Sequence, residues 1–448
     1  MTPHLHPPLS RRGLLRLGAA AGGTAALASL LTACAGSGST AAVTAGPVDL
    51  AFWTHDDGYV KFFTEALPLA EAESGFTYAF DVTKIAAGDI PTKLIAQAVA
   101  NTGTPDVVGL EIGAFARTLR GDIASELLVD LTAAVADQRD DLIAARLAPF
   151  SKDGKLYALD SDTPLVVYYH RADEFERLGI PTDLETWEEL AAATAPISAR
   201  EGVSFGALAV QDPGGTVQSF QIILLQRGGD IFDEDGELNI ETPEAEAALT
   251  FIVDGIASGF YKTVADLYGP SMQSGLKDSS ILGVGMPSWY SSYGIKPSVP
   301  EQEGRWRVAA LPRFADGGGR TSVGGGTGFA AMRNKPNTQA GVDLVLSTYL
   351  NHEQQIKRYR DLGYLPTLRS VFDDPELLTI TDPYFGGQAL FEIYKDVIDD
   401  APAQHQSANS PIMQTVLSGY LLQAYNGQLS PAQALTAATN DFRGQARS

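Results

Sequence analysis

Two spacings of apolar residues alternate along the first part of the chain. Compact or alternating apolar runs are typical of buried β-strands, whereas apolar residues at helical spacing are typical of helices that pack by one face. The pattern predicts strands over 48–53, 76–82 and 107–110 and helices over 59–73 and 91–101. Because each helix separates two strands, this order predicts a largely parallel, doubly wound sheet.

A second unit begins near residue 157. Its expected elements are a strand over 165–169, a short helix over 173–178, and longer amphipathic helices over 217–226, 243–258 and 339–351. Thr186 and Glu189 have the spacing of a capping box, which predicts the start of a further helix. The dipeptide Asp235-Gly236 favours a hairpin turn, and a turn is also expected at Gly283-Val284-Gly285.

The N-terminus has a different pattern, in which a segment containing Arg11, Arg12 and Arg16 precedes an Ala-rich apolar stretch ending at Cys34. This is the layout of an export signal. The run Leu31-Thr32-Ala33-Cys34 resembles a bacterial lipobox, and the segment around the arginine pair resembles a twin-arginine signal. We expect 1–33 to be a cleaved lipoprotein signal, Cys34 to carry a lipid, and 34–47 to be a flexible tether.

Two structural alternatives for this region fit less well. The stretch 17–31 is short and diluted with Gly and Ala, whereas a membrane-spanning helix needs about 20 strongly apolar residues. Cys34 is the only cysteine of the chain, so a buried structural thiol is a weaker explanation than lipidation. With that thiol modified, no disulfide is available to the exported protein.

The chain has 448 residues, enough for two or three lobes with sizeable cores, and a formal net charge of −22. Loss of the leader arginines makes the remaining chain more negative still. Such a surface repels nucleic acid and anionic lipid, so binding to DNA, RNA or a membrane surface is not expected.

Short motifs in a fixed order carry a family resemblance over nearly the whole chain after the leader. They are Phe52-Trp53-Thr54, Lys93-Leu94-Ile95-Ala96, Gly103-Thr104-Pro105-Asp106, Leu156-Tyr157-Ala158-Leu159, Val167-Tyr168-Tyr169, Thr186-Trp187-Glu188-Glu189, Gln226-Arg227-Gly228-Gly229-Asp230, Met286-Pro287-Ser288-Trp289, Gly324-Gly325-Gly326-Thr327-Gly328-Phe329 and Leu362-Gly363-Tyr364-Leu365-Pro366-Thr367. The chain resembles the extracellular solute-binding proteins of family 1, the carbohydrate-binding class that includes the maltose-binding protein.

That resemblance implies an α/β, two-lobed periplasmic-binding-protein fold of type II. Each lobe would be a mixed, mostly parallel sheet flanked by helices, with the ligand cleft between the lobes. Mapped onto this chain, the N-terminal lobe takes 48–160 and 322–355, and the C-terminal lobe takes 161–321 and 356–448. The chain would cross between the lobes near 160–163, 320–326 and 351–358.

The implied function is capture of a sugar or short oligosaccharide by lobe closure and its delivery to the permease subunits of an ABC importer. The protein would be a monomer anchored outside the cytoplasm through Cys34, with no catalysis, cofactor, metal or nucleic-acid partner. Phe52-Trp53-Thr54 and the stretch 383–388 favour the branch that binds arabinose, lactose or short oligosaccharides.

Sugar chemistry singles out a set of candidate ligand-binding residues, because aromatic rings stack on pyranose faces while carboxylates and backbone N–H groups bind hydroxyls. Strand ends are where such sheets bind ligands. The candidates are the aromatic residues Trp53, Trp289, Tyr290 and Tyr364, the acids Asp56, Asp57, Glu111 and Asp162, and the backbone at Gly326 and Thr327. Each has an ordinary alternative, namely a core aromatic, a solvated acid or a glycine hinge.

Some motifs suggest other functions. Gly202-Val203-Ser204-Phe205-Gly206 matches a hydrolase elbow, with His352 and His405 downstream, but a helical segment precedes Ser204 and a strand follows it, the reverse of what the elbow needs. A lipid-anchored glycosidase with two acids stays open, as does a binding protein for a polyol. The histidines are too scattered for a closed zinc site, although His55 stands beside two acids, and the glycines at 324–328 lack the Lys-Ser/Thr of a phosphate loop.

Overall fold

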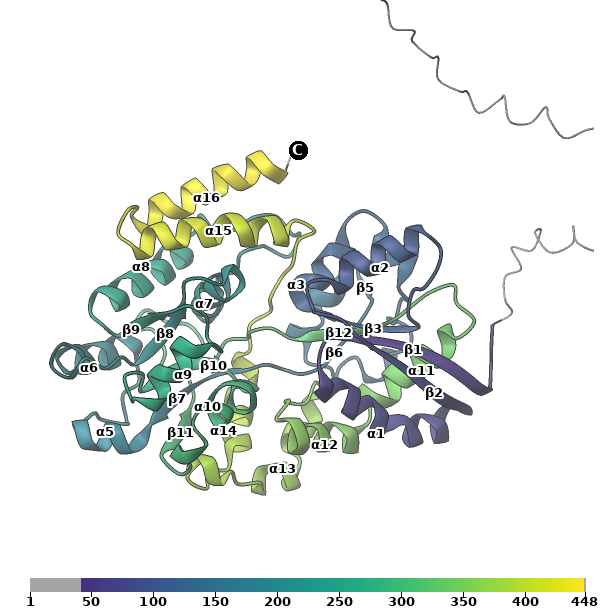
Figure 1. Ribbon diagram of the computed structural model, residues 1–448, viewed down its shortest axis with the longest axis horizontal. Coiled ribbons are helices and arrows are strands. Elements are labelled where there is room, and N and C mark those ends of the chain that lie inside the picture. Colours follow the sequence, from purple (N-terminus) through teal and green to yellow (C-terminus); the bar gives the residue numbers. More distant parts are fainter. Residues whose placement is uncertain (1–41, 447–448) are drawn as a thin grey trace, which may run out of the picture. The chain divides into compact units, whose positions relative to one another are not determined.

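The computed structural model describes residues 42–446 (Figure 1). The expected signal and Cys34 lie outside them. In the first part of the chain, helices and strands are β1 (Gly46–Thr54), α1 (Asp57–Ser74), β2 (Phe76–Lys84), α2 (Ile90–Val99), β3 (Val107–Glu111), α3 (Ile112–Phe115), α4 (Ile123–Leu127), β4 (Ser151–Lys152), β5 (Lys155–Leu156) and β6 (Leu159–Asp160). All five elements predicted before residue 111 are confirmed, and β1 begins within the stretch expected to be tether.

The chain continues through a second series of elements. These are β7 (Val166–Arg171), α5 (Ala172–Leu178), α6 (Trp187–Glu201), β8 (Gly206–Ala209), α7 (Pro213–Gln226), α8 (Pro243–Ala257), β9 (Tyr261–Val264), α9 (Pro270–Lys277), β10 (Gly283–Pro287), a π-helix (Ser291–Ile295), α10 (Lys296–Ser298), β11 (Trp306–Ala309), β12 (Thr327–Ala331), α11 (Thr338–Tyr349), α12 (His352–Leu362), α13 (Pro375–Thr379), α14 (Leu390–Val397), α15 (Ser410–Tyr425) and α16 (Pro431–Ala446). The capping box of α6 is confirmed, with Thr186 and Glu189 bonded reciprocally.

The first sheet of the described chain has the strand order β2-β1-β3-β12-β6. β1 pairs in parallel with β2 and β3, and β12 pairs antiparallel with β3 and β6. Figure 1 shows α1 and α11 on one side of this sheet and α2 and α3 on the other. The predicted doubly wound arrangement is therefore confirmed, with one late strand inserted antiparallel.

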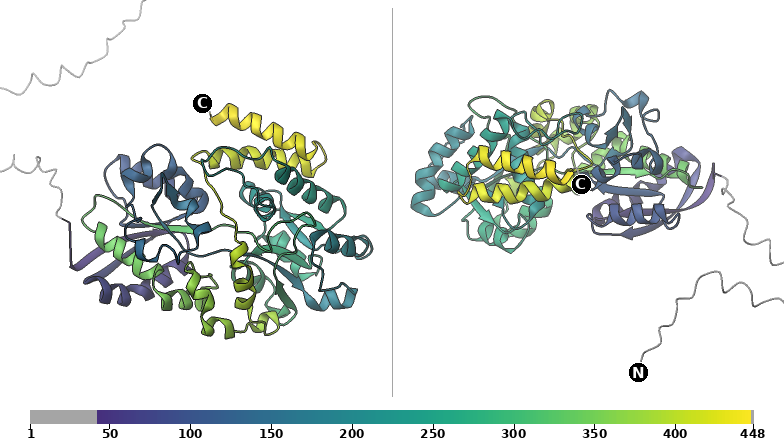
Figure 2. Two further views of the ribbon diagram at one scale, coloured as in Figure 1. Left: turned by 180° about the vertical axis from the view of Figure 1, so that it is seen from behind. Right: turned by 90° about the horizontal axis from the view of Figure 1, so that it is seen from above.

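The second sheet centres on β7, which pairs antiparallel with β10 and β11, while β8 and β9 pair in parallel. A parallel bridge between Ser204 and Ile281 links β8 to β10. This sheet is mixed as expected but has more antiparallel pairing than the sequence pattern indicated. Helices α7, α8, α15 and α16 pack on one another beside it, as the two further views in Figure 2 show.

One predicted turn is wrong. Gly283-Val284-Gly285 is the first part of β10, and glycine serves there for close packing. A Cβ on Gly283 would stand 2.2 Å from the Tyr168 hydroxyl and 3.0 Å from the Phe205 carbonyl oxygen. Only a residue without a side chain lets β10 approach β7 and β8 this closely.

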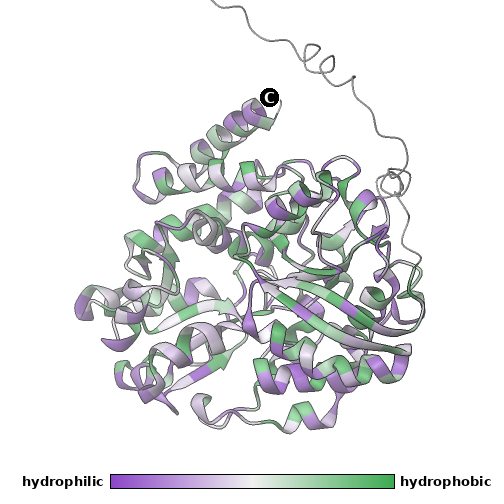
Figure 3. Ribbon diagram, turned by 45° about the vertical axis from the view of Figure 1, so that its right-hand side comes forward, coloured by the Kyte–Doolittle hydropathy of each residue, from purple (hydrophilic) through white to green (hydrophobic). Residues whose placement is uncertain are grey.

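Alternate residues of β7 are buried in two different hydrophobic cores. Along β7, Val167 and Tyr169 belong to the core shared with the first sheet, while Val166 and Tyr168 belong to the core under α6, α7 and α8. Successive strand residues point to opposite faces, so β7 is buried on both sides. Figure 3 shows hydrophobic and hydrophilic residues alternating along both strands and helices. No helix within residues 42–446 has the length and apolar character that a membrane span needs.

Three segments that join the sheets lie side by side and form what we call the junction: 161–165, 310–326 and 363–367. Leu165 and Val323 form an antiparallel bridge, and Thr163 N donates to the Leu365 carbonyl at 3.3 Å. The stretch 351–358, where a crossing was expected, lies at the start of α12, which packs on α1 and α11. The chain reaches the junction only after α12 ends.

A buried ion pair fixes one end of the junction. Arg146 Nε lies 2.7 Å from Asp160 Oδ2, and both side chains are at most 3 % exposed. A second guanidinium nitrogen of Arg146 donates to the Gly325 carbonyl at 2.8 Å. The pair therefore joins the end of β6, where the chain enters the junction, to the residue pair before β12, where the chain leaves it.

We predict that Asp160→Asn lowers the free energy of unfolding by about 3–5 kcal/mol, because it leaves the Arg146 guanidinium buried without a charged partner. The matched control is Lys84→Ala, which breaks the exposed pair between Lys84 and Asp57 (2.8 Å) and should cost about 0–1 kcal/mol. Chemical denaturation of the two variants measures both values. Equal, small losses would contradict the role assigned to the buried pair.

Candidate functional site

A cavity of about 390 Å³ opens between elements of the first sheet and elements of the second. This volume lies in the usual range for small-molecule sites. We call it the inner cavity. Its lining includes the end of β3, the start of α2, the start of α7, the junction glycines, the coil before α15 and the first turn of α15. Its polar and aromatic side chains include Glu111, Arg117, Asp212, Gln218, Gln221, Tyr268, Gln404, His405, Gln406, Ser410 and Gln414.

Glu111 is the acid that the first sheet supplies. It is the last residue of β3, beside Thr327 of β12, and the next residue, Ile112, donates its N–H to the Gly326 carbonyl at 2.9 Å. Burial raises the pKa of Glu111 to about 6, although hydrogen bonds from the backbone of Gly113 and Ala114 act in the opposite direction. The prediction that Glu111 stands at a strand end is confirmed, and its contact with a ligand stays a prediction.

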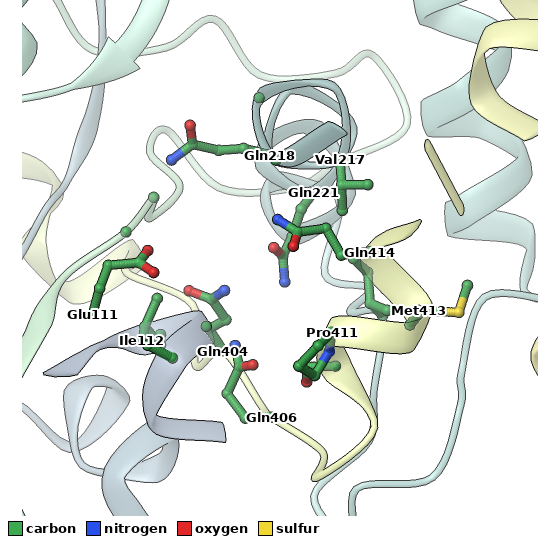
Figure 4. Close-up of a pocket in the computed structure, with 18 of the residues that line it drawn as sticks. Glu111, Ile112, Val217, Gln218, Gln221, Gln404, Gln406, Pro411, Met413 and Gln414 are labelled. Atoms are coloured by element: carbon green, nitrogen blue, oxygen red, sulfur yellow. The ribbon is translucent and has the colours of Figure 1, made fainter. Parts of the chain in front are cut away.

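Glutamines dominate the opposite wall. Gln218 and Gln221 come from α7, Gln414 comes from α15, and Gln404 and Gln406 come from the coil before α15. Figure 4 shows these amides gathered around the space that Glu111 faces. Each amide offers both a donor and an acceptor, so the wall suits a ligand with many hydroxyl groups.

Gln404 differs from the other amides in its surroundings. Its side chain is only 5 % exposed, and no group in the described chain hydrogen-bonds its Oε1. A buried amide oxygen without a donor costs free energy unless another molecule supplies the hydrogen bond. The arrangement therefore points to a hydrogen-bond donor in the inner cavity.

The aromatic side of the inner cavity is formed by Tyr268, which is 42 % exposed. Trp289 stacks on it with ring centroids 6.3 Å apart and planes 16° from parallel, and the Trp289 ring lies next to Gly325. Tyr290, the neighbouring candidate, is fully buried, and its hydroxyl donates to the Leu267 carbonyl at 2.5 Å. Tyr268 thus lines the inner cavity, and Trp289, which is not among the lining residues, stacks on Tyr268.

Tyr364 and Asp56 meet in a second group, apart from the inner-cavity lining. The Tyr293 hydroxyl lies 2.8 Å from the Tyr364 hydroxyl and donates to Asp56 Oδ1 at 3.4 Å. Tyr364 also stacks on Tyr59, at 5.4 Å between ring centroids. Asp56 additionally caps α1 by accepting from Gly58 N.

Two candidates lie buried in the junction. Asp162 is 1 % exposed and accepts from Ser161 Oγ at 2.8 Å, and its other oxygen has no partner in the described chain. Burial raises its pKa. Thr327 is buried at the start of β12, where its carbonyl accepts from Ser161 N. Both side chains have positions suited to holding the junction.

Three further candidates, Trp53, Asp57 and Gly326, lie outside the inner cavity. Trp53 is 5 % exposed and packs under Lys93, whose Nζ lies 4.6 Å from the ring centroid. Asp57 is exposed and pairs with Lys84. Gly326 has a φ of +118°, and a side chain there would clash with Arg146. None of these three belongs to the inner-cavity lining of the described chain.

Ser204, His352 and His405 each have a partner elsewhere in the described chain. Ser204 lies after α6 and before β8, the reverse of an elbow, and its hydroxyl donates to the Gly259 carbonyl at 2.9 Å. His352 pairs with Asp374 at 2.8 Å, and His405 lies beside Asp230 at 3.3 Å. Within residues 42–446, no cluster of three or more histidine, cysteine or acidic side chains has the spacing for a metal ion.

The amides of Gln404, Gln218 and Gln221 and the ring of Tyr268 were not among the residues singled out from the sequence. Gln218 and Gln221 lie three positions apart on the amphipathic helix predicted over 217–226, so their shared face was available as a signal. Gln404 stands in a coil without periodicity, and no sequence pattern marks it.

Several curated proteins share about a quarter of their residues with this chain over most of its length. An arabinooligosaccharide-binding protein of Bacillus subtilis is 25 % identical over 417 residues, covering 89 % of this chain and 92 % of the relative. One of Halalkalibacterium halodurans is 25 % identical over 382 residues and covers 82 % of each. A lactose-binding protein of Rhizobium radiobacter is 27 % identical over 390 residues, covering 83 % of this chain and 86 % of the relative.

Solved structures support the two-lobed fold. The sugar-binding protein MalE of Xanthomonas citri matches with a TM-score of 0.73 at 18 % identity, over 89 % of this chain and 98 % of the other. The cyclic alpha-maltosyl-1,6-maltose binding protein of Arthrobacter globiformis matches with a TM-score of 0.72 at 24 % identity, over 88 % and 97 %. These likenesses establish the type II binding-protein fold that the sequence resemblance implied.

The family itself follows from a match over most of the chain. Residues 60–383 match the family of bacterial extracellular solute-binding proteins. The matched range includes the second sheet, the first sheet apart from β1, the junction, Glu111 and the glutamines of α7. The chain belongs to the family of bacterial extracellular solute-binding proteins.

Proposed function

We propose that this protein captures a neutral sugar or short oligosaccharide outside the cytoplasm and delivers it to the permease of an ABC importer. The observation that carries the proposal is the inner cavity, which is lined by Glu111 and by Gln404 with its buried, unpartnered amide oxygen. Relatives that bind arabinooligosaccharides and lactose support a carbohydrate ligand. A relative in Deinococcus radiodurans, a probable ABC transporter-binding protein, supports the importer.

The lining chemistry matches the needs of sugar binding. A micromolar complex requires about −8 kcal/mol, whereas one net hydrogen bond gives about 1 kcal/mol. Several amide and carboxylate contacts together with apolar stacking are therefore needed. The glutamines and Glu111 supply the amide and carboxylate contacts. Tyr268, on which Trp289 stacks, supplies the apolar stacking.

Lobe closure is the proposed mechanism of capture. We assign 48–160 with 322–362 to one lobe and 161–321 with 363–448 to the other, because α12 packs on α1 and α11 and the chain crosses only after it, and the junction segments supply the hinge. Because the inner cavity has walls from both lobes, a ligand that contacts both walls stabilises the closed arrangement. In this proposal the protein changes no covalent bond of its ligand and acts as a monomer.

The proposed location is the outer face of the cell membrane, reached by export and kept by a lipid on Cys34. The leader layout and the lipobox-like run support this. The family name independently supports an extracytoplasmic location. The remaining candidates, namely Trp53, Asp56, Asp57, Asp162, Tyr290, Gly326, Thr327 and Tyr364, stay predictions as ligand contacts.

A thermal-shift panel of monosaccharides and oligosaccharides, with polyols, peptides and divalent metals as controls, should show stabilisation by one sugar class. A ligand at a hundredfold excess over its Kd adds about 2.7 kcal/mol to the free energy of unfolding when it binds only the folded state.

Trp289→Ala should weaken the binding of that sugar by about 1.5–3 kcal/mol through lost apolar contact, more than Glu111→Gln does. A flat response to all sugars would refute the carbohydrate ligand, and conversion of a sugar would favour the hydrolase.

Gln404→Ala should weaken sugar binding roughly fivefold to tenfold, because one or two hydrogen bonds of about 1 kcal/mol are lost. Thermal stability without ligand should stay unchanged or rise, since the variant removes an unpartnered buried oxygen. The control is Gln428→Ala at an exposed position. Titration calorimetry on both variants gives the affinities, and an unchanged affinity for Gln404→Ala would contradict the assigned contact.

Sugar affinity should fall as the pH drops through about 6, the value to which burial raises the pKa of Glu111. Hydroxyl donors favour the ionised carboxylate, so bound ligand holds Glu111 in its charged form, and affinity decreases by up to about tenfold per pH unit below that pKa. Glu111→Gln should flatten this part of the profile. A profile that keeps its slope in the variant would assign the titration to another group, such as His405.

A further inference from the structure

The motif Gln226-Arg227-Gly228-Gly229-Asp230 does not line the inner cavity of the described chain, yet it reaches the cavity from behind. It begins at the last residue of α7, and the chain turns back at Gly228, which has a φ of +85°. Gly229 N donates to the Leu224 carbonyl at 3.0 Å, and a Cβ on Gly229 would stand 2.4 Å from a methyl group of Leu224. This close turn favours glycine and returns Asp230 to the side of α7.

The buried carboxylate of Asp230 accepts hydrogen bonds from two parts of the glutamine-rich wall. Asp230 is 8 % exposed. Its Oδ1 accepts from Gln221 Nε2 at 3.3 Å and from Ile231 N at 2.7 Å. Its Oδ2 accepts from His405 N at 2.6 Å. One carboxylate therefore joins α7 to the coil that carries Gln404.

The His405 ring adds a second contact between the coil and the same carboxylate. Its Nδ1 lies 3.3 Å from Asp230 Oδ2. The hydrogen bond with Asp230 raises the pKa of His405, and the charges of Asp230, Glu234 and Asp233 act in the same direction, whereas burial acts in the opposite one. The coil is thus held to Asp230 by its backbone and by a side chain whose charged form Asp230 favours.

We propose that Asp230 is a positioning residue for sugar binding, which holds the amides of Gln221 and Gln404 at the spacing that the ligand needs. This inference rests on the proposed function. Asp230 is not among the residues that line the inner cavity, so it acts through Gln221 and through the coil. Figure 4 shows the amides of Gln221 and Gln404 directed toward the same space.

The contacts of Asp230 explain why this position needs a carboxylate. All four come from nitrogen atoms, namely the Gln221 amide, two backbone N–H groups and the His405 ring. A carboxylate accepts with both oxygens, whereas asparagine has one acceptor oxygen and an NH₂ group that would face a donor. Asp230→Asn therefore keeps the shape of the side chain and removes the acceptor from either α7 or the coil.

The test is titration calorimetry with arabinotriose and lactose, the sugar classes that the relatives are named for. Asp230→Asn should weaken binding roughly tenfold, because one or two hydrogen bonds to the sugar are misplaced. Gln404→Ala and the double variant complete a double-mutant cycle. Because Asp230 acts partly through Gln404, the double variant should bind no more than about twofold more weakly than Asp230→Asn alone.

Asp106→Asn is the matched control. Asp106 is 3 % exposed, accepts from Ala51 N at 2.8 Å and lies 3.1 Å from Lys335 Nζ, and it is not among the residues that line the inner cavity. Both substitutions should lower the unfolding temperature, because each leaves buried donors without a charged acceptor. Only Asp230→Asn should weaken sugar binding.

The outcomes separate this inference from the proposed function. Unchanged affinity in Asp230→Asn, independent losses in the double-mutant cycle, or an equal loss in Asp106→Asn overturns the positioning role and leaves the carbohydrate function standing. If no sugar of the thermal-shift panel binds the wild-type protein, the proposed function is wrong and this inference with it.

Hydrogen exchange of the His405 amide in the wild-type protein decides the question if Asp230→Asn does not fold. Slow exchange is expected, because the N–H group is bonded to a buried carboxylate. Exchange at the rate of an open coil would overturn the positioning role.

Discussion

The ion pair between Arg146 and Asp160 holds the part of the chain on which the binding cavity depends. Asp160 is the last residue of β6, where the chain leaves the first sheet, and Arg146 also holds the Gly325 carbonyl just before β12 returns to it. Both charged groups are buried, so each depends on the other for its solvation. Gly325 in turn lines the inner cavity, and Gly326 accepts from the residue after Glu111. The ion pair thus aligns the hinge with the cavity wall.

A binding protein that closes around its ligand needs polar groups that stay unsatisfied until the ligand arrives. The inner cavity has such a group in Gln404, whose buried oxygen has no partner in the described chain. It also has Glu111, whose pKa burial raises to about 6, so its charge is costly until hydroxyl donors approach it. These groups lie on walls from different lobes, and a single ligand that satisfies both favours closure. The same arrangement explains why the amide-rich wall suits neutral polyhydroxylated molecules.

Local pattern predicted the first sheet and its helices well, because β1, α1, β2 and β3 each bury one clear apolar face or run. It failed at Gly283-Val284-Gly285, where glycine allows close strand packing and does not mark a turn. Among site residues, Glu111 was predicted from its place at a strand end. Gln404 was not, because its position depends on how a coil between α14 and α15 crosses the cavity. Tyr290 shows the converse, since the motif that indicated Trp289 and Tyr290 gave no sign that the Tyr290 ring is fully buried.

We propose that a carbohydrate binds between the two lobes against Glu111 and Gln404. A crystal structure of the protein with the neutral oligosaccharide that stabilises it most would test this binding mode. We expect electron density for the sugar in the inner cavity, with hydroxyl groups within hydrogen-bond distance of the Glu111 carboxylate and the Gln404 amide. An inner cavity without sugar, with the ligand bound elsewhere on the protein, would contradict it.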